Sequence, residues 1–231
     1  MSLKNIQIIA IDADDTLWDN EHFFREAEQK FAELLADYMP EHSITRALLK
    51  IEIRNLESYG YGIKSFMLSM IETALHVSEN TLPREAIWKI LDIGKEMLRK
   101  PVVVIDGVEE ALQSLKQDYR LVMATKGDLR DQEKKLEKSG LAHYFHHTEV
   151  MSEKNEQGYR KLIRHLDVLP KEFMMIGNSL KSDIIPVLKL GGFAVHIPYH
   201  ITWEHERIDT EIDHENFYQA DKMVEVLDLL G

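Results

Sequence analysis

The sequence predicts an α/β protein with a doubly wound parallel sheet, interrupted after its first strand by an all-helical segment. Three observations support this prediction. A short β-branched stretch at residues 6–11 is typical of a strand that is buried on both faces of a sheet. Residues 20–100 show helical periodicity and no strand pattern. After Pro101, strand patterns alternate with helical ones, as a parallel sheet with right-handed crossovers requires.

The helical segment contains four amphipathic patterns. Its apolar residues recur at three- and four-residue steps over residues 23–38, 44–56, 63–77 and 86–98. These spacings predict four helices that bury their apolar faces against one another.

The remainder of the chain predicts the rest of the sheet. Strands are expected at residues 121–124, 149–151, 173–176 and 193–197. Helices are expected at residues 108–116, 128–138, 159–166, 183–190 and 221–230.

These patterns divide the chain into two domains. Residues 1–18 and 101–231 are expected to form the α/β core domain, and residues 19–100 a helical cap domain. The insert leaves the chain directly after the first strand. This position is expected to place it above the carboxyl ends of the strands, where open α/β sheets bind ligands.

Composition excludes several classes of protein. The 231 residues carry a net charge of −12, and the basic residues form no blocks, so binding to a nucleic-acid polymer is not expected. There is no cysteine, which fits a reducing compartment. No apolar run is long enough to span a membrane, and the first residues show no signal-peptide pattern. We expect a cytoplasmic protein without a membrane partner, either a monomer or a homodimer.

The first strand ends in the acidic sequence Asp12-Ala13-Asp14-Asp15-Thr16. Carboxylates packed at the edge of an apolar core cost free energy unless a cation or a reaction requires them. A hard divalent ion with oxygen ligands, most simply Mg²⁺, would compensate their charge. Beside such an ion, one carboxylate can act as a nucleophile and another can exchange a proton with the leaving group.

Three further strands end in polar side chains, which parallel pairing brings to the same edge of the sheet. The groups after these strands are Thr125-Lys126-Gly127, then Lys154, and then Gly177-Asn178-Ser179 with Asp183. Carboxylate, hydroxyl, ammonium and amide groups are therefore expected to meet at one site.

The order and spacing of these four motifs resemble those of the haloacid dehalogenase-like (HAD) superfamily. The resemblance covers nearly the whole chain, and the helical insert looks like the C1-type cap of that family. It implies a Rossmann-like core and, for this sequence, the phosphatase branch.

The resemblance also implies a role for each motif residue. Asp12 would attack phosphorus and form an aspartyl-phosphate, and Asp14 would protonate the leaving oxygen and then activate water. Thr125 would hydrogen-bond the phosphoryl group, and Lys154 would neutralise its charge. Asp183 would hold Mg²⁺.

The expected Mg²⁺ ligands are Asp12, the backbone carbonyl of Asp14, Asp183 and Asn178. Many members of the family have Asp at the position of Asn178. An amide oxygen can ligate Mg²⁺ or hold one of its waters, but it brings no charge. We therefore hypothesise a weakened affinity for the metal.

Other residues are expected to contact the substrate. Lys126 would line the cleft, and Gly127 would allow backbone N–H groups to approach phosphate. Trp18 lies in the loop that leaves the first strand, and Lys64 of the insert could meet an anion.

The function expected from these residues is a Mg²⁺-dependent phosphatase that acts on a small phosphomonoester. Three alternatives stay open at this point. A sugar phosphomutase could use the same fold, and a receiver-like module or a degenerate binder could hold phosphoryl groups without turnover. A dehalogenase is disfavoured, because carbon–halogen cleavage needs no acid at the position of Asp14.

Overall fold

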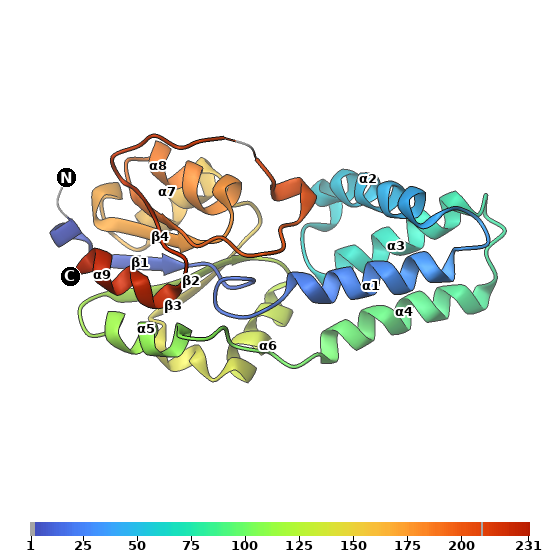
Figure 1. The fold of residues 1–231 in the computed structure, drawn as a ribbon, viewed down its shortest axis with the longest axis horizontal. Coiled ribbons are helices and arrows are strands. Elements are labelled where there is room, and N and C mark those ends of the chain that lie inside the picture. The colour runs from blue at the N-terminus through green and yellow to red at the C-terminus, as the bar shows by residue number, and fades with distance from the viewer. Residues whose placement is uncertain (1–2, 209) are drawn as a thin grey trace. The chain divides into compact units, whose positions relative to one another are not determined.

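The computed structural model describes residues 3–208 and 210–231. The described chain forms two compact units (Figure 1). The first contains the residues up to Glu21 together with Val102–Lys126 and Gln132–Gly231, and the second contains His22–Pro101 and Gly127–Asp131.

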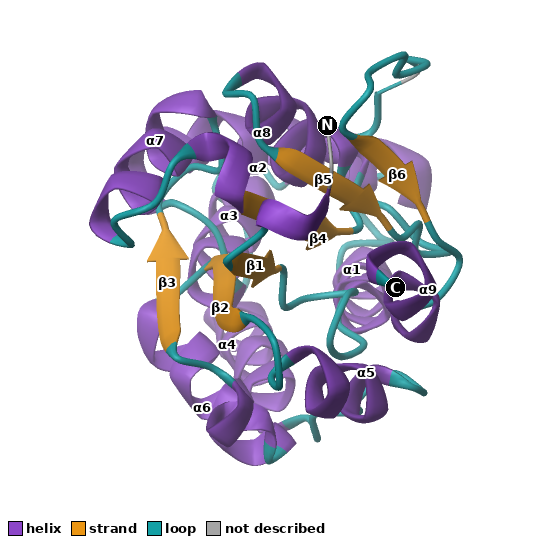
Figure 2. Cartoon of the chain, turned by 90° about the vertical axis from the view of Figure 1, so that its left-hand side faces the viewer, coloured by secondary structure: helices purple, strands orange, loops and turns teal. Residues whose placement is uncertain are grey.

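The first unit is built on a six-stranded parallel sheet, seen in Figure 2. Its strands lie in the order β3-β2-β1-β4-β5-β6. They are β1 (Ile8–Ile11), β2 (Arg120–Lys126), β3 (His147–Met151), β4 (Phe173–Gly177), β5 (Phe193–His196) and β6 (Phe217–Gln219). Since β1 is central, the loop that follows it lies between the ends of β2 and β4.

Helices cover both faces of the sheet (Figure 2). One face carries α5 (Val108–Leu115), α6 (Leu129–Ser139) and α9 (Val226–Leu230), and the other carries α7 (Glu156–His165) and α8 (Ile185–Lys189). Short 3₁₀ helices lie at Leu3–Asn5, Leu141–Tyr144, Pro170–Glu172, Glu204–Glu206 and Met223–Glu225.

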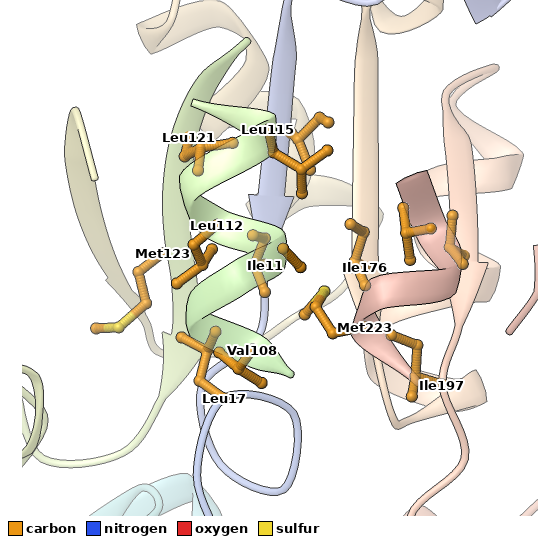
Figure 3. Packing of buried hydrophobic residues seen from close by; sticks show 14 of the residues in the cluster. Ile11, Leu17, Val108, Leu112, Leu115, Leu121, Met123, Ile176, Ile197 and Met223 are labelled. Carbon is orange, nitrogen blue, oxygen red and sulfur yellow. The ribbon is translucent and has the colours of Figure 1, made fainter. Parts of the chain in front are cut away.

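Strand β1 shows why the sequence folds this way. Its residues alternate between the two sides of the sheet, as the pleat of a strand requires. Ile9 and Ile11 pack into the cluster drawn in Figure 3, which contains α5 residues and Met223, while Ile8 and Ala10 pack into the cluster on the other face. All four β1 residues are fully buried.

The second unit contains α1 (Glu21–Leu34), α2 (Glu41–Tyr59), α3 (Ile63–Val77) and α4 (Arg84–Arg99). They enclose one apolar core, to which all four helices contribute; it contains Phe31, Ile44, Leu48, Phe66, Met70 and Ile90. These residues lie at the helical spacings read from the sequence.

The predicted fold class is confirmed by the parallel sheet and its flanking helices. Two predicted elements are different in detail. The helix expected at residues 183–190 is a π-helical turn, Leu180–Ile184, followed by the short α8. The helix expected at residues 221–230 is shortened to a 3₁₀ turn followed by α9. Strand β6 was not predicted, because three residues give too short a pattern.

None of the helices in the described ranges is both long and apolar enough to cross a bilayer.

Candidate active site

The site begins in the loop that follows β1. Asp12 continues the strand by donating its backbone N–H to the carbonyl of Ile176 in β4. The chain then turns sharply, and the N–H of Leu17 donates to the carbonyl of Ala13 at 2.8 Å. The side chains of Ala13 and Leu17 are buried in the core and anchor the turn. The Asp12 side chain is therefore fixed at the carboxyl edge of the sheet.

The structure brings Asp12, Lys154 and Asp183 together. The ammonium of Lys154 donates to Asp12 Oδ1, and to Asp183 Oδ1 at 2.7 Å. The Lys154 side chain is only 2% exposed. The hydroxyl of Tyr159 also donates to Asp183 Oδ1, at 3.4 Å. Three segments that are far apart in the sequence thus meet at one buried ammonium.

The electrostatics of this cluster follow from burial and from its excess of negative charge. Burial raises the pKa of Asp12, the charge of Lys154 opposes that rise, and Asp183 adds to it. Burial by itself would lower the pKa of Lys154, but the two carboxylates raise it overall. The ammonium is therefore charged, and two carboxylates share one positive charge.

Asp14 is held by three donors. Its Oδ1 accepts from the indole Nε1 of Trp18 at 2.8 Å and from Lys135 Nζ at 2.9 Å. Its Oδ2 accepts from Gln132 Nε2 at 2.8 Å. Lys135 also donates to Asn20 Oδ1 at 2.8 Å, which ties the Asp14 loop to α6. The Asp14 carboxylate is thus fixed in position.

Asp15 belongs to the same acidic sequence as Asp12 and Asp14, but its role is structural. It adopts a left-handed backbone conformation, with φ of 62°. Its carboxylate accepts from the backbone N–H groups of Asn20 at 2.8 Å and Glu21 at 3.0 Å, where α1 begins. Burial raises the pKa of Asp15 to about 7. Asp15 therefore caps a helix and takes no part in the Asp12 cluster.

The end of β2 carries the expected threonine and lysine. Thr125 is buried, and its hydroxyl donates to the carbonyl of Lys126 at 3.1 Å. The ammonium of Lys126 donates to Glu206 Oε1 at 2.6 Å and to Ser182 Oγ at 3.0 Å. Gly127 follows with φ of 121°, which a side chain would strain.

The segment after β4 makes the π-helical turn that presents Asp183. Asp183 Oδ2 accepts from the backbone N–H of Ser179 at 3.0 Å. Gly177 is required beneath it, because a Cβ there would lie 2.3 Å from Asp183 Oδ2. The Asn178 amide oxygen lies 3.5 Å from the hydroxyl of Thr16, so it faces the Asp12 loop. Single π-helical turns of this kind are frequent at functional sites.

Two predicted substrate contacts need comment. Trp18 is only 1% exposed, and its indole is bonded to Asp14, so its position fits a supporting role better than a direct contact with substrate. Lys64 lies in the second unit and pairs with Asp128 at 2.9 Å. A substrate contact by Lys64 stays a prediction.

Sequence reasoning did not single out Gln132, Lys135, Tyr159 or Glu206. Gln132 and Lys135 lie three residues apart on a predicted helix, a spacing that places both side chains on one face. Glu206 ends a 3₁₀ turn of three residues between β5 and β6, which is too short to give a periodic sequence pattern.

The sheet and its acidic, lysine-containing edge are typical of α/β enzymes that act at the carboxyl ends of parallel strands. The family model for the haloacid dehalogenase-like hydrolases matches residues 6–191. The chain therefore belongs to this family of hydrolases, and the expected family and enzyme class are confirmed.

Several known proteins are similar to this chain. A crystal structure of a haloacid dehalogenase-like family hydrolase from Xanthomonas campestris is 38% identical, with a TM-score of 0.87, and the match covers 98% of this chain and 92% of that one. N-acylneuraminate-9-phosphatase from Mus musculus is 24% identical over 202 residues, 83% of this chain and 82% of the relative. A predicted phosphoglycolate phosphatase from Haemophilus somnus 129pt shares the fold at 17% identity, with a TM-score of 0.64 and coverage of 98% and 99%.

Proposed function

We propose that this protein is a Mg²⁺-dependent phosphatase that hydrolyses a small phosphomonoester through an aspartyl-phosphate on Asp12. The main support is the pair of carboxylates, Asp12 and Asp183, that share the buried ammonium of Lys154. The presence of Asp14 two residues after Asp12, fixed by three donors, adds support. The curated relatives, which are phosphatases, agree with this proposal.

The donor set fits Mg²⁺. The carboxyl groups of Asp12 and Asp183 share a single ammonium, that of Lys154, and supply oxygen donors for a metal. In the part of the chain that the structure describes, no three His, Cys, Asp or Glu side chains form a metal group. Mg²⁺ is commonly bound by only one or two carboxylates and keeps several waters, so two carboxylates suffice.

The residues that would hold the metal are Asp12, Asp183, the backbone carbonyl of Asp14 and the side chain of Asn178. Bound there, Mg²⁺ supplies positive charge that offsets the negative charge of the phosphoryl oxygens and of Asp12.

In the first step, a carboxylate oxygen of Asp12 attacks phosphorus, and the bond from phosphorus to the leaving oxygen breaks. Asp14, which must take up a proton before this step, gives that proton to the leaving oxygen, so an alcohol leaves. In the second step, Asp14 takes a proton from water, the oxygen of that water attacks the phosphorus, and the bond to Asp12 breaks. Inorganic phosphate and free Asp12 result.

The remaining groups position the phosphoryl group. Lys154 places positive charge beside Asp12, where it would offset the negative charge on the oxygens of the phosphoryl group that is transferred. The hydroxyl of Thr125 and the backbone at Gly127 would donate to the phosphoryl oxygens, and Lys126 would line the same side. Trp18, whose indole donates to Asp14 Oδ1, is proposed to fix the Asp14 carboxyl group and not to contact the substrate.

The substrate is proposed to be a small phosphorylated metabolite. A phosphorylated sugar acid is the first compound to test, because one group of relatives is named N-acylneuraminate-9-phosphatase. The C1-type cap, the cytoplasmic location and the monomeric or homodimeric state stay predictions.

The decisive experiment is a phosphate-release screen over some tens of phosphomonoesters with Mg²⁺, run beside Asp12→Asn. We expect the parent protein to release phosphate and Asp12→Asn to release none, because a neutral amide is a poor nucleophile. When the reaction of the parent protein is stopped with acid at low temperature, a phosphoryl group should be found on Asp12. Turnover that persists in Asp12→Asn, or isomerised sugar phosphate in place of free phosphate, would overturn the proposal.

A further inference from the structure

A second buried network lies beside the proposed site and centres on Glu206. Its Oε1 accepts from Lys126 Nζ at 2.6 Å, and its Oε2 accepts from the hydroxyls of Ser179 and Ser182, each at 2.6 Å. Lys126 also donates to Ser182 Oγ at 3.0 Å. The network therefore closes a ring of Lys126, Ser182 and Glu206.

The ring joins three parts of the sheet edge. Lys126 ends β2, the two serines belong to the turn after β4, and Glu206 comes from the segment between β5 and β6. The Glu206 side chain is only 12% exposed. A buried carboxylate is costly unless its oxygens are bonded, and here both oxygens of Glu206 accept bonds.

The bonds continue from Glu206 to Asp183. Ser179 Oγ, which donates to Glu206, accepts from the backbone N–H of Ser182, and the backbone N–H of Ser179 donates to Asp183 Oδ2. A Cβ at position 177 would lie 2.3 Å from Asp183 Oδ2, so the Asp183 carboxyl group lies close to the backbone of β4. A displacement of the two serines would therefore move the Asp183 carboxylate.

We propose that Glu206 is a positioning residue, which fixes the Asp183 turn and the Lys126 ammonium in the arrangement the reaction needs. This inference rests on the proposed function, since it concerns the same site. Glu206 reaches the chemistry through Lys126, Ser179 and Ser182. Partners that orient the ligands of a metal often affect metal affinity as strongly as activity.

The test is Glu206→Gln, which keeps the shape of the side chain but removes its charge and one acceptor oxygen. Glu204→Gln is the matched control, because Glu204 lies in the same 3₁₀ turn and is exposed. We expect Glu206→Gln to weaken Mg²⁺ binding, measured by titration calorimetry without substrate, about tenfold, and to lower kcat by a similar factor. Glu204→Gln should match the parent in both.

A double variant tests the route of the effect. If Glu206 acts partly through Lys126, adding Lys126→Met to Glu206→Gln should cost less than the sum of the single effects. Mg²⁺ affinity and kcat that are unchanged in Glu206→Gln, with only the melting temperature lowered, would overturn the inference and leave a purely structural role.

These outcomes are separate from those of the proposed function. If Asp12→Asn still releases phosphate, the proposed function fails, whatever Glu206→Gln shows. If the parent binds Mg²⁺ and releases phosphate while Glu206→Gln behaves like Glu204→Gln, only the role of Glu206 fails.

Discussion

At the scale of single residues, the position of the Asp14 carboxyl group is determined by the side chains around it. In the proposed mechanism Asp14 first gives a proton and then takes one, so its carboxyl group must lie within hydrogen-bond reach of the reacting oxygens. Trp18, Gln132 and Lys135 supply that position through three bonds of 2.8–2.9 Å. Of these, Lys135 is the one whose removal deletes a charged partner and leaves the core packing largely intact.

We therefore expect Lys135→Met to lower kcat by about 10- to 100-fold, the equivalent of losing one hydrogen bond to a charged group. The reduction should be largest for substrates with poor leaving groups, since these depend most on the proton from Asp14. Steady-state kinetics over a series of aryl phosphates would measure it. Lys134→Met, an exposed neighbour on the same helix, is the control, and equal activities of the two variants would contradict the role of Lys135.

Asn178 gives a second prediction at this scale. Its amide oxygen brings no charge to the proposed metal ligands, so Asn178→Asp should add one anionic ligand. The Mg²⁺ concentration for half-maximal phosphate release should fall, and direct Mg²⁺ binding should tighten in parallel. An unchanged concentration would show that Asn178 does not limit the affinity for the metal.

The sequence was informative about the residues of the site for a physical reason. Asp12, Thr125, Lys154 and Asp183 each lie at or after the carboxyl end of a strand, and parallel strands bring such positions to one edge. The supporting residues were not visible in this way. Glu206 follows no strand directly, and the partners of Asp14 on α6 depend on how that helix lies against the Asp12 loop.

At the scale of elements, the π-helical turn Leu180–Ile184 is the segment that shapes the site most directly. The sequence pattern predicted a regular helix there, since periodicity cannot distinguish a wide turn from an α-helical one. The difference matters, because the turn directs Asp183 back toward Gly177 and Lys154.

Gly177→Ala tests how tightly this turn is packed. The new methyl group would lie 2.3 Å from Asp183 Oδ2, so either the strand or the turn must shift. We expect a loss of about 1–3 kcal/mol in the free energy of unfolding, typical of overpacking, together with a loss of most activity. Urea denaturation and phosphate release measure the two effects. A variant with parental stability and activity would show that the turn can relax.

At the scale of the whole molecule, the alternation of strands and helices was sufficient to predict the fold class. Long apolar strands such as β2 and β4 were located within a few residues, because burial on both faces leaves a continuous apolar run. The edge strand β6 was missed, since its three residues are only partly buried or exposed and show no such run.

The acid stability of the molecule should reflect Glu206. Burial alone would raise its pKa, but the charge of Lys126 and three hydrogen bonds lower it from 4.5 to about 2. A depressed pKa contributes stability above the ordinary value, and that contribution is lost as the pH falls toward 2. At pH 7, Glu206→Gln should therefore be less stable than the parent by roughly 3 kcal/mol.

The difference between the parent and Glu206→Gln should shrink between pH of about 4.5 and 2. Denaturant unfolding of the two proteins at a series of pH values measures it. A difference that stays constant across this range would mean that the charge of Glu206 contributes nothing to folding.

The central place of β1 also has a consequence for biosynthesis. Ile8 pairs with Arg120 of β2 on one side and with Phe173 of β4 on the other. Strand β1 is therefore synthesised long before the two strands with which it pairs. A nascent chain that has not yet passed Asp183 carries Asp12 without the second carboxyl group that shares the Lys154 ammonium. The nascent chain is thus expected to have no phosphatase activity until its last third has emerged from the ribosome.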